Sequence, residues 1–280
     1  MKKAIHIKKQ SGESQVFDVN KLIKSLRRSR ASESLVQEIA FQIQEQVEEG
    51  MSTKKIYQQA FKMLRNKSRV SASKYKLKKA LMELGPTGFP FEKLIGKLME
   101  TEGFTTQIGI IVQGNCVPHE IDVIARKDNK HYVIECKYHS DPNRFCNVKT
   151  PLYIHSRFLD VEKNLKLQKE HDSIIHKGGL YTNTRFTSDA IQYGTCVGLL
   201  LTSWDYPQGN GLKERIDASG LHPITALTTL TNAEKSKLLE AGIVICKELL
   251  EDPKLLEKIG VDKKRHKKIL DDSGELCKGD

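Results

Sequence analysis

Long apolar runs are absent from this chain of 280 residues. No stretch approaches the roughly 20 consecutive apolar residues of a membrane-spanning helix, and the first residues lack the apolar core of a signal peptide. The six cysteines are scattered without a Cys-x-x-Cys pair, so the sequence indicates neither a zinc site nor a disulfide framework. These absences predict a cytoplasmic protein of a reducing compartment, with no membrane partner.

Positive charge is in excess only in the first third of the sequence. The net charge is +11, and residues 1–90 hold 19 Lys and Arg against 8 Asp and Glu, so the remaining residues balance. A basic surplus suits phosphate-bearing partners. It predicts that a polyanion binds the N-terminal segment, with a merely solvated basic surface as the alternative.

Length and sequence breaks divide the chain into three segments. A chain of 280 residues exceeds the usual size of one domain. The residues Gly85–Gly88, with a proline among them, are typical of a linker. From about Pro223 onward the pattern indicates short helices only. We therefore expect domains at residues 1–86, 87–222 and 223–280.

The hydrophobic periodicity predicts a different architecture for each segment. The first is a short hairpin followed by four helices, and the third is two helical hairpins with a glycine at each turn. The second is a layered α/β fold, a mixed sheet flanked by helices, because its strands are continuously apolar. The expected strands of the second segment are Thr105–Gln113, Glu120–Arg126, His131–Tyr138 and Cys196–Thr202, and its expected helices are Phe91–Met99, Val148–Leu159 and Thr187–Tyr193.

Two neighbouring strands of this second segment carry charged side chains. Alternation places Glu120 and Asp122 on one face of the first strand, and Glu135 and Lys137 on one face of the second. Ionised groups inside a sheet are costly unless they bind a metal or one another. If the strands pair, Asp122 and Glu135 can converge on one cation beside the Lys137 ammonium. Carboxylate ligands suit Mg²⁺ or Mn²⁺, which would activate a water and neutralise charge on a scissile phosphate.

An aspartate followed about twelve residues later by Glu-x-Lys, on two strands after a helix, resembles the PD-(D/E)XK nucleases. The stretches Glu120–Ala125 and Glu135–His139 resemble their Mrr-type restriction-endonuclease branch. The resemblance covers about residues 87–222. The proline of the family motif is missing, since Ile121 precedes Asp122.

The resemblance implies a catalytic centre in this chain. Asp122 and Glu135 would be metal ligands together with the carbonyl group of Cys136, and Lys137 would position the attacking water. Some members add a glutamate from the preceding helix, and Glu92 occupies a suitable first-turn position. The alternative is a solvated strand edge with an ordinary Glu–Lys pair.

Two stretches downstream could contact phosphates. Lys149, Tyr153 and Arg157 fall at four-residue spacing and would share one helical face. Residues 182–185, Thr-Asn-Thr-Arg, precede a helix whose N-terminus could hold an anion. An ordinary protein surface is the alternative for both.

The first hairpin and helix resemble the ATP-cone, the nucleotide-binding regulatory module of ribonucleotide reductases and of their transcriptional repressor. The matching residues run from Ile7 to Leu26, and the resemblance covers about residues 3–86. It implies that Lys9 and Lys21 bind the phosphates of a purine nucleoside triphosphate, ATP or dATP. Ile7 would lie beside the base, and Thr53 would add a polar contact.

The match to the ATP-cone has two departures. Gln10-Ser11 stand where the family has Arg-Asp, and Gln15 replaces an acidic residue. A cone that has lost its ligand is therefore the alternative.

The C-terminal hairpins resemble a helix-hairpin-helix module, in which amide groups at a glycine turn face a phosphate. The basic residues Lys263–Arg265, close to Gly260, favour DNA contact, and a protein–protein adaptor is the alternative. The whole sequence predicts a nucleotide-regulated, Mg²⁺-dependent DNA endonuclease that forms a homo-oligomer. Two other functions stay open: a non-enzymatic, nucleotide-sensing DNA-binding protein that retains the nuclease fold, and a nuclease directed at RNA or at a nucleic-acid structure.

Overall fold

The computed structural model describes residues 4–9, 12–171 and 173–279. These residues form two compact units. One unit contains the chain up to Leu77 together with Ala226–Thr229, and the other contains Lys78–Thr225 and the residues from Leu230 onward. No described helix combines the length and the apolar character that crossing a bilayer requires.

The first unit opens with an antiparallel hairpin formed by β1 (His6–Lys8) and β2 (Ser14–Val16). Gly12 turns the chain at a φ of 88°, a conformation that favours glycine. Asp18 caps the first helix by accepting a hydrogen bond from the Asn20 amide at 2.9 Å, as its position in the sequence predicts. The helices of this unit are α1 (Val19–Arg27), α2 (Glu33–Gln46), α3 (Thr53–Lys67) and α4 (Arg69–Tyr75). The next helix, α5 (Leu77–Met82), belongs to the second unit except for its first residue.

The sequence pattern places a fourth helix through Tyr75, Leu77, Leu81 and Leu84, and the structure has α5 (Leu77–Met82) there. A further helix, α4 (Arg69–Tyr75), was not predicted. The pattern missed α4 because Ser71, Ser73 and Lys74 leave this short segment without an apolar stripe.

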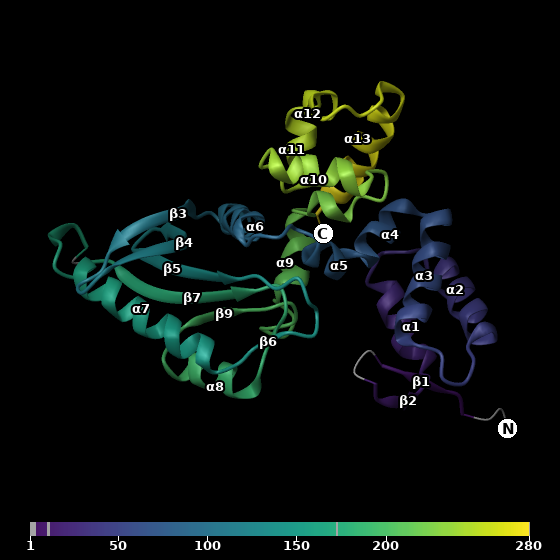
Figure 1. Cartoon of the computed structure of the whole chain (residues 1–280), viewed down its shortest axis with the longest axis horizontal. Helices are drawn as coiled ribbons and strands as arrows, with labels where there is room; N and C mark the ends of the chain where they lie inside the picture. The colour runs from purple at the N-terminus through teal and green to yellow at the C-terminus, as the bar shows by residue number, and fades with distance from the viewer. Residues whose placement is uncertain (1–3, 10–11, 172, 280) are drawn as a thin grey trace. The chain divides into compact units, whose positions relative to one another are not determined.

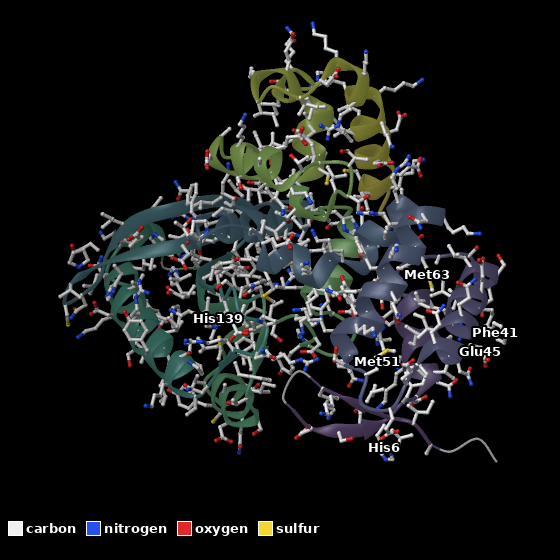
Figure 2. All side chains as sticks on the ribbon, turned by 45° about the vertical axis from the view of Figure 1, so that its right-hand side comes forward. His6, Phe41, Glu45, Met51, Met63 and His139 are labelled. Atoms are coloured by element: carbon white, nitrogen blue, oxygen red, sulfur yellow. The ribbon has the colours of Figure 1, made fainter. Side chains whose placement is uncertain are left out.

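One apolar core holds the hairpin to the helices of the first unit. Ile7 of β1 is buried, and so are Leu26, Ile43 and Leu64 from α1, α2 and α3. Met51 belongs to the same core, where Figure 2 labels it. Each such buried aliphatic side chain stabilises the fold by roughly 1.5–3 kcal/mol. The core therefore fixes the hairpin, and with it any site built on β1.

The second unit is built on a five-stranded sheet in the order β3-β4-β5-β7-β9. Neighbours among β3, β4 and β5 are antiparallel, whereas β5, β7 and β9 run parallel. This confirms the mixed α/β class that the sequence predicts. The strands are β3 (Thr105–Gln113), β4 (Pro118–Lys127), β5 (Lys130–Lys137), β7 (Ile175–Thr182) and β9 (Leu200–Thr202), and β6 (Phe145–Cys146) pairs separately with β8 (Arg185–Phe186).

Strand β7 lies where the sequence predicts only a polar stretch. Gly178 and Gly179 conceal it, because glycine is unfavourable inside strands. A Cβ atom at Gly178 would lie 2.6 Å from Leu199 and 2.9 Å from Phe158, so close packing requires glycine here. The strand expected at Cys196–Thr202 is also shorter than predicted, because α8 runs to Cys196.

Helices cover both faces of this sheet, which lies between α6 and α7 in Figure 1. Phe91, Leu94 and Ile95 of α6 are fully buried, as the apolar stripe of this helix predicts. On α7, Phe158 and Val161 pack against apolar residues of β4 and β5. The helices of this region are α6 (Phe89–Thr101), α7 (Lys149–Leu165), η1 (Lys169–His171), α8 (Ser188–Cys196) and α9 (Leu212–Ser219).

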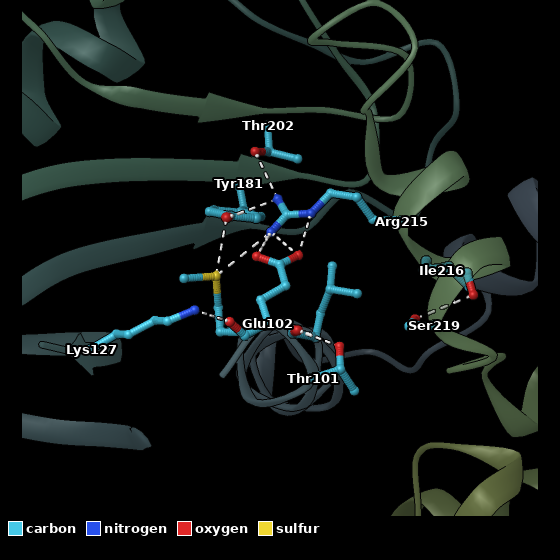
Figure 3. A network of polar contacts seen from close by, with 10 residues as sticks. Thr101, Glu102, Lys127, Tyr181, Thr202, Arg215, Ile216 and Ser219 are labelled. Atoms are coloured by element: carbon cyan, nitrogen blue, oxygen red, sulfur yellow. Dashed lines mark hydrogen bonds and ion pairs between the residues drawn. The ribbon is translucent and has the colours of Figure 1, made fainter. Parts of the chain in front are cut away.

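Arg215 of α9 joins three elements of the second unit (Figure 3). Its guanidinium donates to the Glu102 carboxylate, with Nε 2.8 Å from Oε1 and Nη2 2.6 Å from Oε2. It also donates to the hydroxyl oxygens of Tyr181 at 3.0 Å and Thr202 at 3.3 Å. Only 11% of the Arg215 side chain is exposed, against 37% of Glu102. The network therefore ties the end of α6 to β7 and β9.

The chain from residue 222 onward is helical, as predicted. Thr231 and Glu234 form a capping box at the start of α10, which fixes the beginning of that helix. Gly242 and Gly260 turn the two hairpins at φ of 77° and 82°. The helices are η2 (Ile224–Ala226), α10 (Asn232–Glu240), α11 (Cys246–Glu251), α12 (Lys254–Lys258) and α13 (Lys263–Cys277).

Candidate active site

The two acidic strands of the sequence pattern are neighbours in the sheet. A two-residue turn at Asp128-Asn129 joins β4 directly to β5, and Val123 pairs with Ile134. The backbone N–H of Cys136 donates to Asp122 Oδ2 at 2.7 Å. This bond fixes the Asp122 carboxylate beside the backbone of Glu135 and Cys136.

Strict alternation does not hold along β4. Ile121 and Ile124 are both buried, and both belong to the apolar cluster under Phe158 of α7. Gly109 of β3 has a φ of 63°, and it stands opposite Asp122 between the paired residues Ile108 and Ile110. The ladder is distorted at this point, so side chains before and after it on β4 do not follow strict alternation between the two faces of the sheet. Bulges beside functional residues have the same effect.

Glu135 forms a close ion pair that the sequence did not predict. Arg157 Nη1 of α7 donates to Glu135 Oε2 at 2.6 Å, and less than a fifth of either side chain is exposed. Arg157 Nη2 also donates to the carbonyl oxygen of Glu120. Arg157 therefore faces the acidic cluster and neutralises one of its members. Nothing in the local sequence links Glu135 to a residue on a helix 22 positions later.

The carboxyl groups of this region hold protons more tightly than usual. Burial, together with the charges of Asp122, Glu120 and Glu135, raises the pKa of Glu92 to about 7. Burial and the Asp122 charge raise the pKa of Glu135 to about 6, although Arg157 opposes this. Burial also raises the pKa of Asp122, against the Cys136 hydrogen bond. Partly buried acids that repel one another are typical of functional sites.

The remaining predicted residues lie around these acids. Glu92 lies in the first turn of α6, where its Oε1 is near Gly88. Lys137 is the exposed last residue of β5. Burial and the nearby acids raise the pKa of the Cys136 thiol well above its usual range, so this residue offers its carbonyl oxygen rather than a thiolate.

The donor chemistry fits a hard divalent cation, but the ligand oxygens are not gathered. Among the described residues, no three carboxylate groups place ligand oxygens within 4.8 Å of one another. The Glu135 carboxylate is instead held in an ion pair with Arg157. A cation at Asp122 would therefore have to displace the guanidinium from Glu135.

The predicted phosphate contacts are partly wrong. Thr182, Asn183 and Thr184 are fully buried, and Asn183 Oδ1 accepts from the His139 amide at 2.9 Å while its amide donates to the His139 carbonyl at 2.7 Å. These side chains support the loop after β5 and are closed to a phosphate. On α7, Tyr153 is exposed and lies against the Arg157 guanidinium, 5.5 Å from the ring centroid.

In the first unit, three of the four predicted nucleotide-binding residues share one pocket. Ile7, Lys21 and Thr53 line a pocket of about 170 Å³. Lys9 does not line it and instead pairs with Glu13, Nζ to Oε2, at 2.9 Å. Gln10 and Ser11, where the sequence departs from the ATP-cone, lie outside the described residues.

Two aromatic residues of this pocket were missed. The rings of Tyr57 and Tyr75 stack, with centroids 5.0 Å apart and an angle of 11° between their planes. Burial raises the pKa of the Tyr75 hydroxyl, which bonds to Ser25. Residues 18 positions apart on separate helices leave no periodic signal, so only the packing of α3 against α4 reveals the pair.

Comparisons with known proteins agree on one group of relatives. A family profile described as AF1548-like, C-terminal, matches residues 222–277. An uncharacterized protein of Archaeoglobus fulgidus is 37% identical over 177 residues, which are 63% of this chain and 95% of that protein. The solved structure titled "Crystal Structure of Protein of Unknown Function AF1548" is 33% identical with a TM-score of 0.55, and covers 68% of this chain and 98% of its own.

Proposed function

This chain belongs to the AF1548-like family, and we propose that it is a metal-dependent DNA endonuclease of the PD-(D/E)XK kind. One observation carries the proposal. Glu92, Asp122 and Glu135 come from three elements and share an electrostatic environment that raises the pKa of each. Such a set of acids, next to a lysine at the end of β5, is the arrangement expected of a phosphodiester hydrolase.

Mg²⁺ or Mn²⁺ would be held by the carboxylates of Asp122 and Glu135 and by the carbonyl oxygen of Cys136. When bound, the ion would supply a water of lowered pKa and positive charge for the scissile phosphate. Glu92 would complete the acidic set from α6. A divalent ion would also relieve the mutual repulsion that raises the pKa of these carboxyl groups.

The protein's own residues orient this site. The amide of Cys136 holds Asp122 in one position, because a half-buried carboxylate with a backbone donor loses rotational freedom. Arg157 stands in for a cation at Glu135. Once an ion replaces it there, the guanidinium becomes available for a phosphate oxygen, which suits its forked donors. The exposed Lys137 ammonium lies on the same strand and would place the attacking water.

The first unit would bind a purine nucleoside triphosphate that regulates cleavage. The pocket of about 170 Å³ is smaller than the roughly 300–1,000 Å³ of most ligand pockets, so it would hold only part of a nucleotide. Among the described residues, no side-chain hydrogen bond or ion pair holds the Lys21 ammonium, so it can meet a phosphate. Lys9 would leave its ion pair with Glu13 and bind the phosphates instead. The basic surplus of residues 1–90 favours this polyanion.

The alternative is a nucleotide-sensing DNA-binding protein that retains the nuclease fold without turnover. The ion pair of Glu135 with Arg157 favours it, because a permanently paired Glu135 cannot bind a metal. In the C-terminal hairpins, Arg265 and Lys263 are likewise paired, with Glu234 at 2.5 Å and Glu257 at 3.0 Å. In this region, the other basic side chains of α13 would have to make the contacts with DNA.

Cleavage of supercoiled and linear DNA, with Mg²⁺ or Mn²⁺ and with or without ATP, separates the two functions. The endonuclease predicts nicked or linear products that Glu135→Gln abolishes. Glu100→Gln is the matched control, because Glu100 is an acid on α6 that pairs with Lys97 away from the site. DNA binding without cleavage under either metal would establish the alternative.

A further inference from the structure

Three histidines far apart in the sequence meet at the end of the sheet opposite to the acidic site. His131 is the second residue of β5 and pairs in register with His176, the second residue of β7. His171 ends η1, in the connection between α7 and β7. The ring centroids lie 5.0 Å apart for His131 and His176, 5.8 Å for His131 and His171, and 5.1 Å for His171 and His176.

Two of these three rings are buried, and ring nitrogens of all three lack hydrogen-bond partners in the described part of the chain. His131 is 1% exposed and His176 is 7% exposed. Their Nδ1 atoms lie 2.9 Å apart, while Nε2 of both rings and Nδ1 of His171 are buried without a hydrogen-bond partner among the described residues. Buried polar atoms without partners cost free energy, and they are rare. Three of them in one cluster show that hydrogen bonds among the described residues do not satisfy these rings.

The rings are in the state that binds metals. Burial, with the charges of Arg126 and the two other histidines, lowers the pKa of His131 to about 3. Burial likewise lowers the pKa of His176, which also faces Glu162 and Lys166. For these two strand histidines, burial thus favours the neutral ring, the form with a lone pair free for a metal ion.

The spacing suits a tetrahedral ion. Two nitrogens bound to one Zn²⁺ at about 2.0–2.1 Å lie about 3.3 Å apart. An ion bound through the Nδ1 atoms of His131 and His176, now 2.9 Å apart, would replace their mutual hydrogen bond after a shift of a few tenths of an ångström, and it would leave both Nε2 atoms without a partner among the residues described. One ligand atom from each of the three histidines falls within 4.8 Å of the others. Imidazole nitrogens suit Zn²⁺ and related transition metals, whereas Mg²⁺ prefers oxygen.

We propose that His131, His171 and His176 form a binding site for one Zn²⁺ ion. It is separate from the acidic site, because Glu135 lies four positions after His131 on β5, about 13 Å along the strand. The ion would tie η1 to the beginnings of β5 and β7, and with three protein ligands its fourth tetrahedral position would be left for a water. No sequence motif indicates this site, since its three ligands lie on three separate elements.

The test uses the full chain, freed of metal with a chelator and dialysed against Zn²⁺ or Co²⁺. Metal analysis of the dialysed chain is expected to give one Zn²⁺ per chain that excess Mg²⁺ does not displace. Co²⁺ is expected to give the visible absorption of a tetrahedral site, and Zn²⁺ to raise the melting temperature.

His171→Asn is the principal variant, because this residue is only partly buried and lies outside the sheet. It is expected to weaken Zn²⁺ binding more than about 100-fold, since loss of an outer-shell partner alone costs about 10–100-fold. His131→Asn should have the same effect, and if it fails to fold, His171→Asn still decides. His155→Asn is the matched control, because His155 bonds to Tyr193 at 2.9 Å outside the cluster. A wild-type chain that retains no Zn²⁺, or a His171→Asn chain that retains as much as the wild type and the control, would overturn the proposal.

Discussion

Metal binding at the acidic site should depend steeply on pH. A divalent ion binds carboxylates, so it must displace any protons that they hold. The pKa of Glu92 is about 7 and that of Glu135 about 6, both above the ordinary range. Below pH 6 both groups are therefore largely protonated. The apparent affinity should rise as the pH rises through these two values and level off above about pH 8.

The magnitude follows from the two pKa values. Between pH 8 and pH 5, protonation of Glu92 alone lowers the apparent affinity about 90-fold, and that of Glu135 about 10-fold. Together they predict a fall of about 1,000-fold. The change Glu92→Gln removes the larger factor and should leave a fall of only about 10-fold over the same range.

Mn²⁺ is the useful probe, because free Mn²⁺ can be counted by electron paramagnetic resonance in titrations from pH 5 to pH 8.5. Glu100→Gln is the control on the same helix and should keep the full pH dependence. An affinity that hardly changes with pH, or an equal slope in the wild type and Glu92→Gln, would refute the assignment of these acids to a metal site.

Three further predictions follow from the described contacts. The variants Asp122→Asn and Lys137→Met should each lower the rate of DNA cleavage at least about 100-fold. The double variant should lose little more activity than either single variant, because such groups act as a unit. Additive losses in single-turnover cleavage assays would contradict this. ATP at 100 times its dissociation constant should stabilise the first unit by about 2.7 kcal/mol. In calorimetry, Lys21→Ala should remove this stabilisation and Lys24→Ala should keep it. Equal stabilisation of both variants by ATP would exclude Lys21 as a phosphate ligand. The variant Arg215→Met should lower the free energy of unfolding by about 2–4 kcal/mol. This is less than the roughly 3–5 kcal/mol lost when a fully buried ion pair is broken, because Glu102 is 37% exposed and can be hydrated. A decrease of less than about 1 kcal/mol in urea denaturation would disprove that the network stabilises the fold.

Local sequence patterns were sufficient to predict several strands and helices of the second unit. The strand Thr105–Gln113 has the predicted bounds, and the two-residue turn at Asp128-Asn129 made β4 and β5 neighbours. Because a tight turn fixes the register of an antiparallel pair, the sequence alone placed Asp122 close to Glu135. The apolar stripe of α6 likewise predicted its buried face, with Glu92 in the first turn.

Packing between distant segments decided the rest. Glycines that weaken a strand in isolation allow β7 to pass under Phe158, so the strand could be recognised only with α7 in place. Arg157 reaches Glu135 because α7 lies across the sheet, and this contact decides whether the acids are paired or open to a metal. The three histidines come together only when β5, β7 and η1 are assembled. Sequence periodicity reports the facing of one element at a time, whereas these contacts depend on how elements far apart in the chain are brought into register.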